Sequence, residues 1–189
     1  MKTLYIDVET TGLVQYNHGI ITLAYIIDDD NGVELTRGEI EMNPLSYSKK
    51  VSAKALEVNG YTIEQFETFK DAKIACVEFI DILNEYLDKE DFNDKYKLVA
   101  YNADFDSKFV QYWMDKLVPN TYWKTIDYKH LDPFAMVKYL QHFGIIDTGK
   151  SQSLENVCKY YDITLIAHNA MSDINATRVL HKLLVKEYL

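Results

Sequence analysis

The first 42 residues constrain the fold more than any other part of the chain, because they hold three strand-like segments in a row. Apolar and β-branched residues dominate 4–9 and 20–27, and polar and apolar residues alternate over 33–42. The run DDDNG at 28–32 is a turn signal typical of a hairpin. Three consecutive strands joined by short connections are expected to form an antiparallel meander.

The remainder of the chain alternates helical patterns with short strand-like runs. Apolar spacing predicts helices at 52–60, within 62–88, and at 106–117, 133–143, 151–161 and 172–188, whereas 97–101 and 123–128 are typical of strands. The predicted fold class is therefore α/β, with a mixed five-stranded sheet (the meander plus two further strands) flanked by helices. Because no linker-like segment interrupts the 189 residues, we expect a single domain over 1–189.

Composition and charge exclude several classes of protein. The net charge of −9 argues against coating of long nucleic-acid duplexes, which usually needs a basic face. Cys76 and Cys158 lie outside any C-x-x-C pattern, so we expect buried free thiols rather than a zinc cluster or a redox pair. No apolar run approaches the roughly 20 residues of a membrane span, and strand-like sequence from Thr3 leaves no room for a signal peptide. We expect a soluble cytoplasmic protein.

Two carboxylates interrupt the first strand-like segment. Asp7 and Glu9 are two residues apart, so their side chains point to the same face of a strand, about 6–7 Å apart along the backbone. Like charges on one face repel, and burying them is costly unless a cation lies between them. Hard divalent cations such as Mg²⁺ prefer carboxylate oxygens. Taken alone, however, the pair fits a solvent-facing strand at least as well.

Two further acids are expected where helices begin. Asp106 falls in the first turn of the helix after strand 97–101, and Asp173 follows Ser172, which we expect to be the N-cap of the last helix. Capping alone explains either acid, and Asp104 is an alternative cap. His168 lies five residues before Asp173. Four acids at strand ends and helix starts favour one shared site over four unrelated positions.

These motifs resemble those of the DEDDh branch of the DnaQ-like 3'→5' exonuclease superfamily, which has a ribonuclease-H-like fold. They appear in the family's order as DVETTGL at 7–13, NADFDSKFV at 102–110 and HNAMSD at 168–173. The segments 43–66 and 153–163 are also similar to the family, so the resemblance spans nearly the whole chain. Tyr101 departs from the pattern, because many relatives carry histidine before the asparagine. This departure argues against a close relation to the proofreading subgroup.

The resemblance implies a two-metal site. Its four acids would be Asp7, Glu9, Asp106 and Asp173, holding two divalent ions, Mg²⁺ or Mn²⁺. The resemblance places the third acid directly after a phenylalanine, here Phe105, and so favours Asp106 over Asp104. The H-x4-D spacing implies that His168 is the general base, and a histidine with a pKa near about 6.5 can accept a proton around neutral pH.

The resemblance also implies contacts to the 3' end of the substrate. Thr10 and the neighbouring backbone of Thr11 and Gly12, where the glycine permits a tight turn, would meet the terminal 3'-hydroxyl. Leu13 would wedge against the terminal base. Core packing remains an alternative for Leu13, and packing beneath the helix is the favoured interpretation for Phe105. Asn102 either orients the terminal nucleotide or caps a turn.

The implied activity is metal-dependent 3'→5' hydrolysis at single-stranded 3' ends, releasing nucleoside 5'-monophosphates, with DNA favoured. Two metal ions about 4 Å apart can activate water and stabilise the leaving oxygen. Only two arginines occur in the chain, which argues against extended phosphate clamping and for a short single strand as the partner. The lysines at 49, 50, 54 and 108 either touch phosphates or form solvated surface.

Two other functions fit the same motifs. An RNA-directed exoribonuclease, oligoribonuclease-like or RNA-trimming, differs by contacts to the 2'-hydroxyl that the sequence does not locate. A catalytically silent polymerase-accessory subunit is the other, and the complete set of four acids and His168 argues against it. The chain ends just past the last helix, so we expect no fused polymerase. A non-covalent polymerase or replication partner stays open, as does the oligomeric state.

Overall fold

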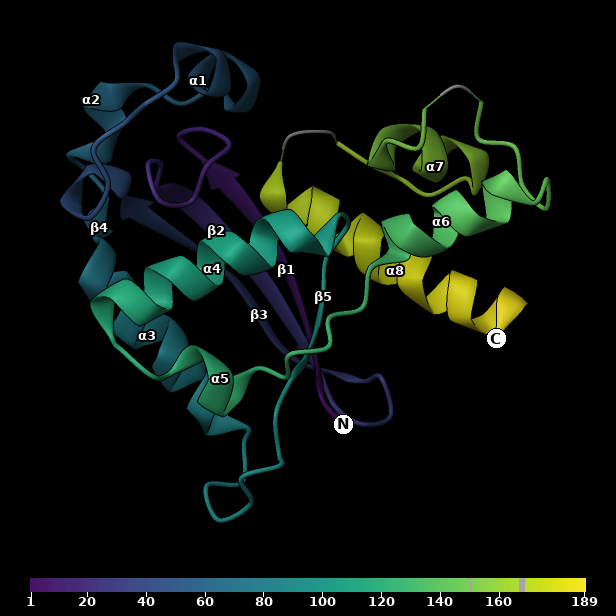
Figure 1. Cartoon of the computed structure of the whole chain (residues 1–189), viewed down its shortest axis with the longest axis horizontal. Helices are drawn as coiled ribbons and strands as arrows, with labels where there is room; N and C mark the ends of the chain where they lie inside the picture. Colours follow the sequence, from purple (N-terminus) through teal and green to yellow (C-terminus); the bar gives the residue numbers. More distant parts are fainter. Residues whose placement is uncertain (150, 167–168) are drawn as a thin grey trace.

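The computed structural model describes residues 1–149, 151–166 and 169–189 and contains a five-stranded mixed sheet. The strands are β1 (Thr3–Thr10), β2 (Ile20–Asp28), β3 (Glu34–Asn43), β4 (Lys70–Asp71) and β5 (Lys97–Val99), in the spatial order β4-β3-β2-β1-β5. The first three strands pair antiparallel, whereas β5 runs parallel to β1 and β4 runs parallel to β3. The predicted meander and mixed sheet are confirmed (Figure 1).

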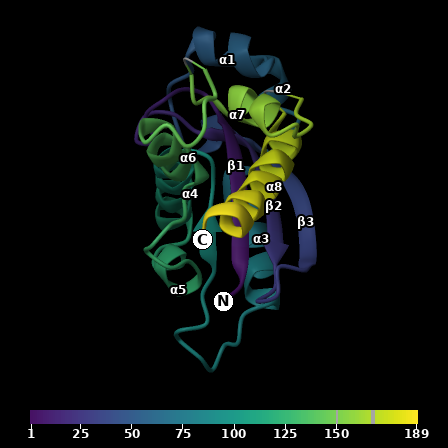
Figure 2. The same cartoon turned by 90° about the vertical axis from the view of Figure 1, so that its right-hand side faces the viewer.

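Helices cover both faces of the sheet. They are α1 (Ala53–Asn59), α2 (Ile63–Phe66), α3 (Ala72–Glu85), α4 (Ala103–Leu117), α5 (Tyr122–Thr125), α6 (Pro133–His142), α7 (Leu154–Tyr160) and α8 (Ala170–Tyr188). The helices α3 and α4 pack on one face, and α8 crosses the other (Figure 2). Within the described ranges, none of these helices has both the length and the apolar character needed to cross a bilayer.

Alternation along β1 decides what each face of the sheet carries. Leu4, Ile6 and Val8 point into the main core, which α3 and α4 close, while Tyr5 packs on the face covered by α8. Because side chains alternate in a strand, Asp7 and Glu9 share the face of Tyr5. The first strand therefore offers its apolar residues to one core and its acids to the α8 side.

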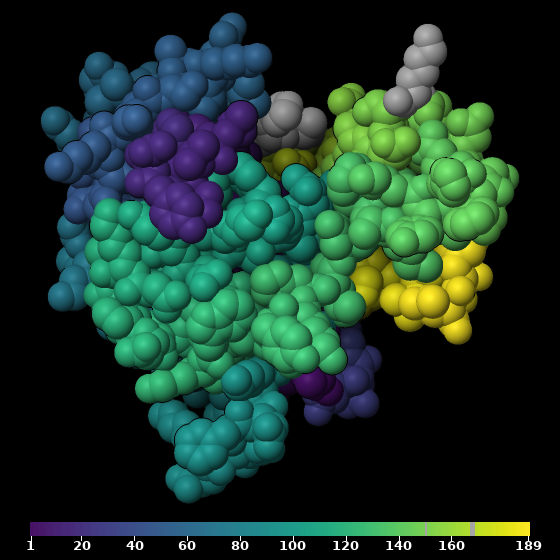
Figure 3. All heavy atoms as spheres, in the orientation of Figure 1, coloured from purple at the N-terminus to yellow at the C-terminus, as the bar shows by residue number. Residues whose placement is uncertain are grey.

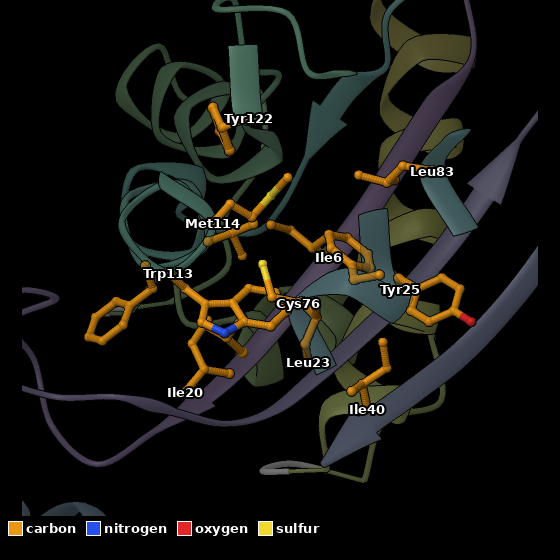
Figure 4. Close-up of a cluster of buried hydrophobic side chains, with 14 of the residues drawn as sticks. Ile6, Ile20, Leu23, Tyr25, Ile40, Cys76, Leu83, Trp113, Met114 and Tyr122 are labelled. Carbon is orange, nitrogen blue, oxygen red and sulfur yellow. The ribbon is translucent and has the colours of Figure 1, made fainter. Parts of the chain in front are cut away.

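The main core is built around aromatic and branched residues from both sequence halves. Trp113 of α4 is fully buried and donates its indole N–H to the carbonyl of Ala72 over 3.1 Å. Cys76 of α3 lies beside it in the same cluster (Figure 4). Both cysteines are buried and free, as predicted, and burial raises the pKa of the Cys76 thiol to about 12.

Several local predictions are wrong. The segment 123–128 is not a strand, because Tyr122–Thr125 form the short helix α5 and only Ile126 makes a single bridge, to Tyr96. The remaining strand of the sheet is instead β4, which interrupts the helical pattern of 62–88 and separates α2 from α3. The N-cap of α8 is Asn169 rather than Ser172, since the Asn169 side chain accepts the Ser172 N–H over 2.9 Å.

Candidate active site

Three carboxylates converge where β1 ends and α8 begins. Asp7, Glu9 and Asp173 each offer an oxygen, and these oxygens all lie within 4.8 Å of one another. All three side chains are partly buried. Asp7 and Glu9 are brought together by the two-residue period of β1, and Asp173 by its place in the first turn of α8. A pair of acids from the start of the chain and one acid from near its end thus form one acidic cluster.

Asp106 lies beside this cluster but is not one of the three converging acids. It is only 4% exposed, and its Oδ1 accepts a hydrogen bond from the backbone N–H of Val8 over 3.1 Å. The strand β5 pairs with β1 only as far as Tyr5, so Asp106 takes over as the partner of the β1 backbone beyond that point. Asp106 therefore approaches the segment that joins Asp7 and Glu9.

Asp104 occupies a different environment from Asp106. It is exposed and forms an ion pair with Lys108, one turn further along α4, with 2.6 Å between the ammonium nitrogen and the carboxylate. Asp104 is not the helix cap either, because the N-cap of α4 is Asn102. The geometry supports Asp106, rather than Asp104, as the acid of the site.

Burial and mutual repulsion raise the pKa values of these acids. Burial is the largest cause for Asp7, whose pKa lies well above its usual range, and the charges of Asp106, Asp173 and Glu9 add to it. Burial and then Asp173 raise the pKa of Glu9 to about 7, partly offset by a hydrogen bond from Asn59. Burial raises the pKa of Asp106 to about 8 against the effect of the Val8 N–H.

This donor set fits a divalent cation. Carboxylates whose pKa values rise to near neutral pH lack a compensating positive charge. A bound cation would supply that charge and favour the ionised form of the carboxylates. Carboxylate oxygens, with no sulfur or imidazole among the three converging ligands, are typical of Mg²⁺ and Mn²⁺ sites. His168, the predicted general base, lies outside the described residues.

The turn after β1 is held by its own hydroxyl groups. The Thr10 hydroxyl donates to the carbonyl of Gly12 over 2.8 Å. The Thr11 hydroxyl donates to the Lys50 carbonyl and accepts the Gly19 N–H, each over 2.9 Å. A Cβ at Gly12 would lie 2.4 Å from the ring of His18, so only glycine fits. Both threonine side chains are thus engaged in the turn, which leaves backbone groups to face a ligand.

Leu13 projects from this turn into solvent. Its side chain is 81% exposed, which excludes core packing as its role. In Figure 3 the turn (purple) lies on the surface, above the atoms of α4 (teal) and beside the segment that carries α1 (blue). An apolar side chain held out by a rigid turn is suited to contact a ligand rather than the core.

A pocket of about 290 Å³ lies between the turn, α1 and α4. It is lined by Val8, Glu9, Thr10, Gly12, Leu13, Ser52, Lys54, Ala55, Val58, Asn59 and Phe105. Glu9 connects it directly to the acidic cluster. Phe105 is partly buried against the core, with its ring tilted against that of Phe109 at 4.9 Å between ring centroids, yet it also faces the pocket. A larger hollow of about 510 Å³ at the end of α6 contains none of the acids.

Asn102 shapes the backbone at the start of α4. It adopts a left-handed conformation with φ 67°, which asparagine tolerates better than most residues. Its side chain makes no capping hydrogen bond and does not line the pocket, while its N–H donates to Asp132 over 2.9 Å. The contact of Asn102 with the terminal nucleotide stays a prediction. Tyr101 donates its hydroxyl hydrogen to the Gln152 carbonyl and packs on Phe134.

Sequence reasoning missed most of the contribution of α1 to the site. Lys54, Val58 and Asn59 line the pocket, but the sequence identifies only Lys54, as one of four lysines with phosphate contact or solvated surface as alternatives. Val58 is an apolar residue on a short helix that the structure shows to have no buried positions. Its 51% exposure shows that the apolar face of α1 is turned toward the pocket rather than the core.

Comparisons with known proteins agree with this geometry. A model of the family RNase_T, described as exonuclease, matches residues 4–180. The DNA polymerase III PolC-type of Thermotoga maritima is 26% identical over 178 residues, which are 91% of this chain and 11% of that protein. The corresponding protein of Thermotoga petrophila matches to the same extent. The chain therefore spans about a tenth of the length of these curated relatives.

Solved structures share the same fold. Exonuclease I of E. coli in complex with a dT13 oligonucleotide has a TM-score of 0.80 and 18% identity, covering 97% of this chain and 40% of that one. The zinc-bound form of the E. coli enzyme with single-stranded DNA has a TM-score of 0.83 and 17% identity, covering 99% and 41%. Since the family model spans the motifs at 7–13, 102–110 and 168–173, the chain belongs to the DnaQ-like exonuclease family RNase_T, with its ribonuclease-H-like fold.

Proposed function

We propose that the protein is a metal-dependent 3'→5' exonuclease that releases nucleoside 5'-monophosphates from single-stranded 3' ends, with DNA as the favoured substrate. The observation that carries this proposal is the convergence of Asp7, Glu9 and Asp173 within 4.8 Å, next to a pocket that opens beside Glu9. Family membership supports hydrolysis of nucleic acid, and the dT13 complex of E. coli Exonuclease I supports a single-stranded ligand.

In this proposal the four acids hold two divalent ions. Asp7, Glu9 and Asp173 would bind the first, and Asp106 with Asp7 would contribute to the second. When bound, such ions lower the pKa of a water molecule and neutralise charge at the phosphate. The Val8 N–H keeps one oxygen of Asp106 in place, so the carboxylate is oriented before any ligand arrives.

The remaining roles concern the terminal nucleotide. His168 would accept the proton of the attacking water. Backbone groups of Thr10, Thr11 and Gly12 would orient the 3'-hydroxyl, and the side chains of Leu13 and Phe105 would contact the faces of the terminal base. The position of Leu13 and Phe105 along one pocket supports this assignment.

The curated relatives extend the proposal to a partner. They are DNA polymerases of which the matched region is about a tenth, so we include a polymerase or another replication protein as a binding partner of this domain.

A product assay tests the function. Matched single strands of DNA and RNA, labelled at the 5' or the 3' end, are incubated with Mg²⁺, with Mn²⁺ or with EDTA. We expect mononucleotides from the 3' end, only with metal and faster from DNA. Faster loss of RNA would replace DNA by RNA in the proposal, and no metal-stimulated hydrolysis at high protein concentration would indicate an accessory subunit.

The proposed role of His168 as general base predicts the effect of its substitution. His168→Ala should leave metal binding intact but reduce kcat by roughly 100-fold or more, since general base catalysis contributes about 10²–10⁴. Titration with Mn²⁺ followed by calorimetry measures the binding, and initial rates measure kcat. His142→Ala is the matched histidine control, because His142 is an exposed residue in the last turn of α6 and does not line the pocket of the acids. Near-wild-type kcat in His168→Ala would disprove this role.

A further inference from the structure

The helix α1 turns one face toward the pocket and packs little against the rest of the protein. Lys54 and Val58 are four residues apart and, with Ala55 and Asn59, lie on the pocket side of the helix. None of the residues of α1 is buried. Its ends are tied to the turn after β1, because Ser52 donates its N–H to Thr11 over 2.8 Å and Asn59 donates its amide to the Thr10 carbonyl over 3.0 Å.

Most polar side chains of the pocket already have partners. The Thr10 hydroxyl is bonded to Gly12, the Ser52 hydroxyl oxygen accepts from Ala55, and the Asn59 amide nitrogen is bonded to Thr10. Glu9 is an acceptor when ionised. Within residues 1–149, 151–166 and 169–189, the ammonium of Lys54 has no ion pair and no hydrogen bond. The Lys54 ammonium is therefore the cationic hydrogen-bond donor of this pocket that is available to a ligand.

Other lysines near the site are placed differently. Lys108 is held by Asp104 over 2.6 Å, and Lys49 and Lys50 are exposed outside the pocket lining. In a chain of net charge −9, Lys54 is the cationic side chain among the lining residues of this pocket, so it is the group there that can pair with an anionic ligand. The ligand of the proposed function is anionic at every linkage.

We propose that Lys54 contacts a phosphate of the bound 3'-terminal segment, so that α1 is an element that binds the nucleic-acid backbone. This inference rests on the proposed function. The apolar neighbours Leu13, Val58 and Phe105 would contact base faces, whereas the long, exposed side chain of Lys54 would contact the backbone. The Lys54 ammonium would act as a single point charge, whereas an arginine would form two parallel hydrogen bonds to the phosphate.

Equilibrium binding tests this contact independently of hydrolysis. A short 5'-fluorescein-labelled oligothymidylate is titrated with the full chain in CaCl2 and in EDTA, and the dissociation constant is followed by anisotropy between about 50 and 200 mM NaCl. Lys54→Met keeps the length of the side chain and removes its charge. Lys73→Met is the matched control, because Lys73 is likewise the second residue of its helix, α3, and is exposed away from the pocket.

We expect Lys54→Met to weaken binding roughly two- to fivefold at low salt and to reduce the log–log salt slope by about 0.7, the value of one single-strand phosphate contact. Lys73→Met should change neither, and Lys54→Arg should retain the slope. A methylphosphonate at one of the last linkages should weaken the wild type but not Lys54→Met. An unchanged slope in Lys54→Met, or a loss that depends only on the terminal base, overturns the phosphate contact.

The same titration separates this inference from the proposed function. Binding by the wild type with a shallower slope in Lys54→Met supports the contact even if no hydrolysis occurs. Hydrolysis by the wild type with equal slopes in both proteins removes Lys54 and leaves the exonuclease assignment in place. A wild type that binds no oligonucleotide in CaCl2 or in EDTA contradicts the contact.

Discussion

Asp104 and Asp106 are two residues apart in the first turn of α4, and their different surroundings predict opposite effects of substitution on activity. Asp106→Asn should lower kcat/KM by roughly 100-fold or more, because several kcal/mol of charge stabilisation depend on a metal-binding carboxylate. Asp104→Asn should lose only the exposed pair with Lys108 and stay within about twofold of wild type. Steady-state kinetics on a single-stranded substrate measures both. Equal losses in the two variants would contradict the assignment of Asp106.

Leu13 offers a second contrast at the residue scale. Because its side chain is 81% exposed, Leu13→Ala should leave the free energy of unfolding within about 0.5 kcal/mol. The loss of contact with the terminal base should raise KM roughly fivefold, since such base contacts contribute about 1 kcal/mol or more. Leu23→Ala, fully buried in β2, should instead cost about 2–5 kcal/mol of stability. Urea denaturation and initial rates distinguish the two effects.

The residues of the site differ in how far the sequence predicts them. The pair Asp7 and Glu9 follows from the period of a strand, and their motif context from the family resemblance. From the sequence, Lys54 is only one of four lysines that could contact phosphates, and Asn59 is not predicted, because their position depends on two hydrogen bonds that tie α1 to the turn after β1. A local pattern does not encode contacts between segments more than 40 residues apart.

At the scale of elements, α8 is anchored to the sheet by a buried charge network. Asp28, at the end of β2, is 1% exposed and accepts two hydrogen bonds from Arg178, over 3.0 and 2.7 Å. Lys182 completes its neutralisation over 2.8 Å. Since Asp173 lies only five residues before Arg178 on the same helix, this anchor also fixes the start of α8, where the acid joins the cluster.

Removal of Arg178 should therefore destabilise the protein strongly. Arg178→Met leaves a buried carboxylate with only Lys182, and we expect a loss of about 3 kcal/mol in the free energy of unfolding. Arg37→Met is the matched control, because Arg37 is the other arginine of the chain and pairs on the surface with Glu34, for a cost below about 1 kcal/mol. Comparable losses in urea denaturation would show that Asp28 is not the critical partner.

The elements that the sequence failed to predict are short and depend on tertiary contacts. The two residues of β4 are charged and exposed, and they form a strand only because the end of β3 presents its backbone beside them. The aromatic and β-branched run at 123–128 is typical of a strand, yet the Thr125 hydroxyl bonds to backbone carbonyls of its own turn. The long strands and helices, by contrast, follow from periodicity alone.

At the scale of the whole molecule, the acidic site opposes folding whenever no cation is bound. The pKa of Asp106 is about 8 and that of Glu9 about 7 in the folded protein, both above the values of an unfolded chain. The folded state therefore binds more protons than the unfolded state above about pH 4, so the free energy of unfolding falls as the pH rises toward 8. Partly buried His130 and His181, whose pKa values are lowered by desolvation, act in the opposite sense and only up to about pH 7.

A comparison of pH 7 with pH 9 spans the pKa of Asp106 and avoids the histidines, although the raised pKa values of the Cys76 and Cys158 thiols act in the same direction as the carboxylates. In EDTA we expect the free energy of unfolding to fall by about 1 kcal/mol or more, because one pKa unit corresponds to about 1.4 kcal/mol. Saturating Mg²⁺ should reverse much of this loss, since it binds the ionised acids of the folded state only. Asp106→Asn should make the pH dependence in EDTA shallower, which separates the site from general repulsion in a chain of net charge −9. Urea denaturation at both pH values gives these quantities. A metal-free protein equally stable at pH 7 and pH 9 would mean that its carboxylates are already compensated without a cation.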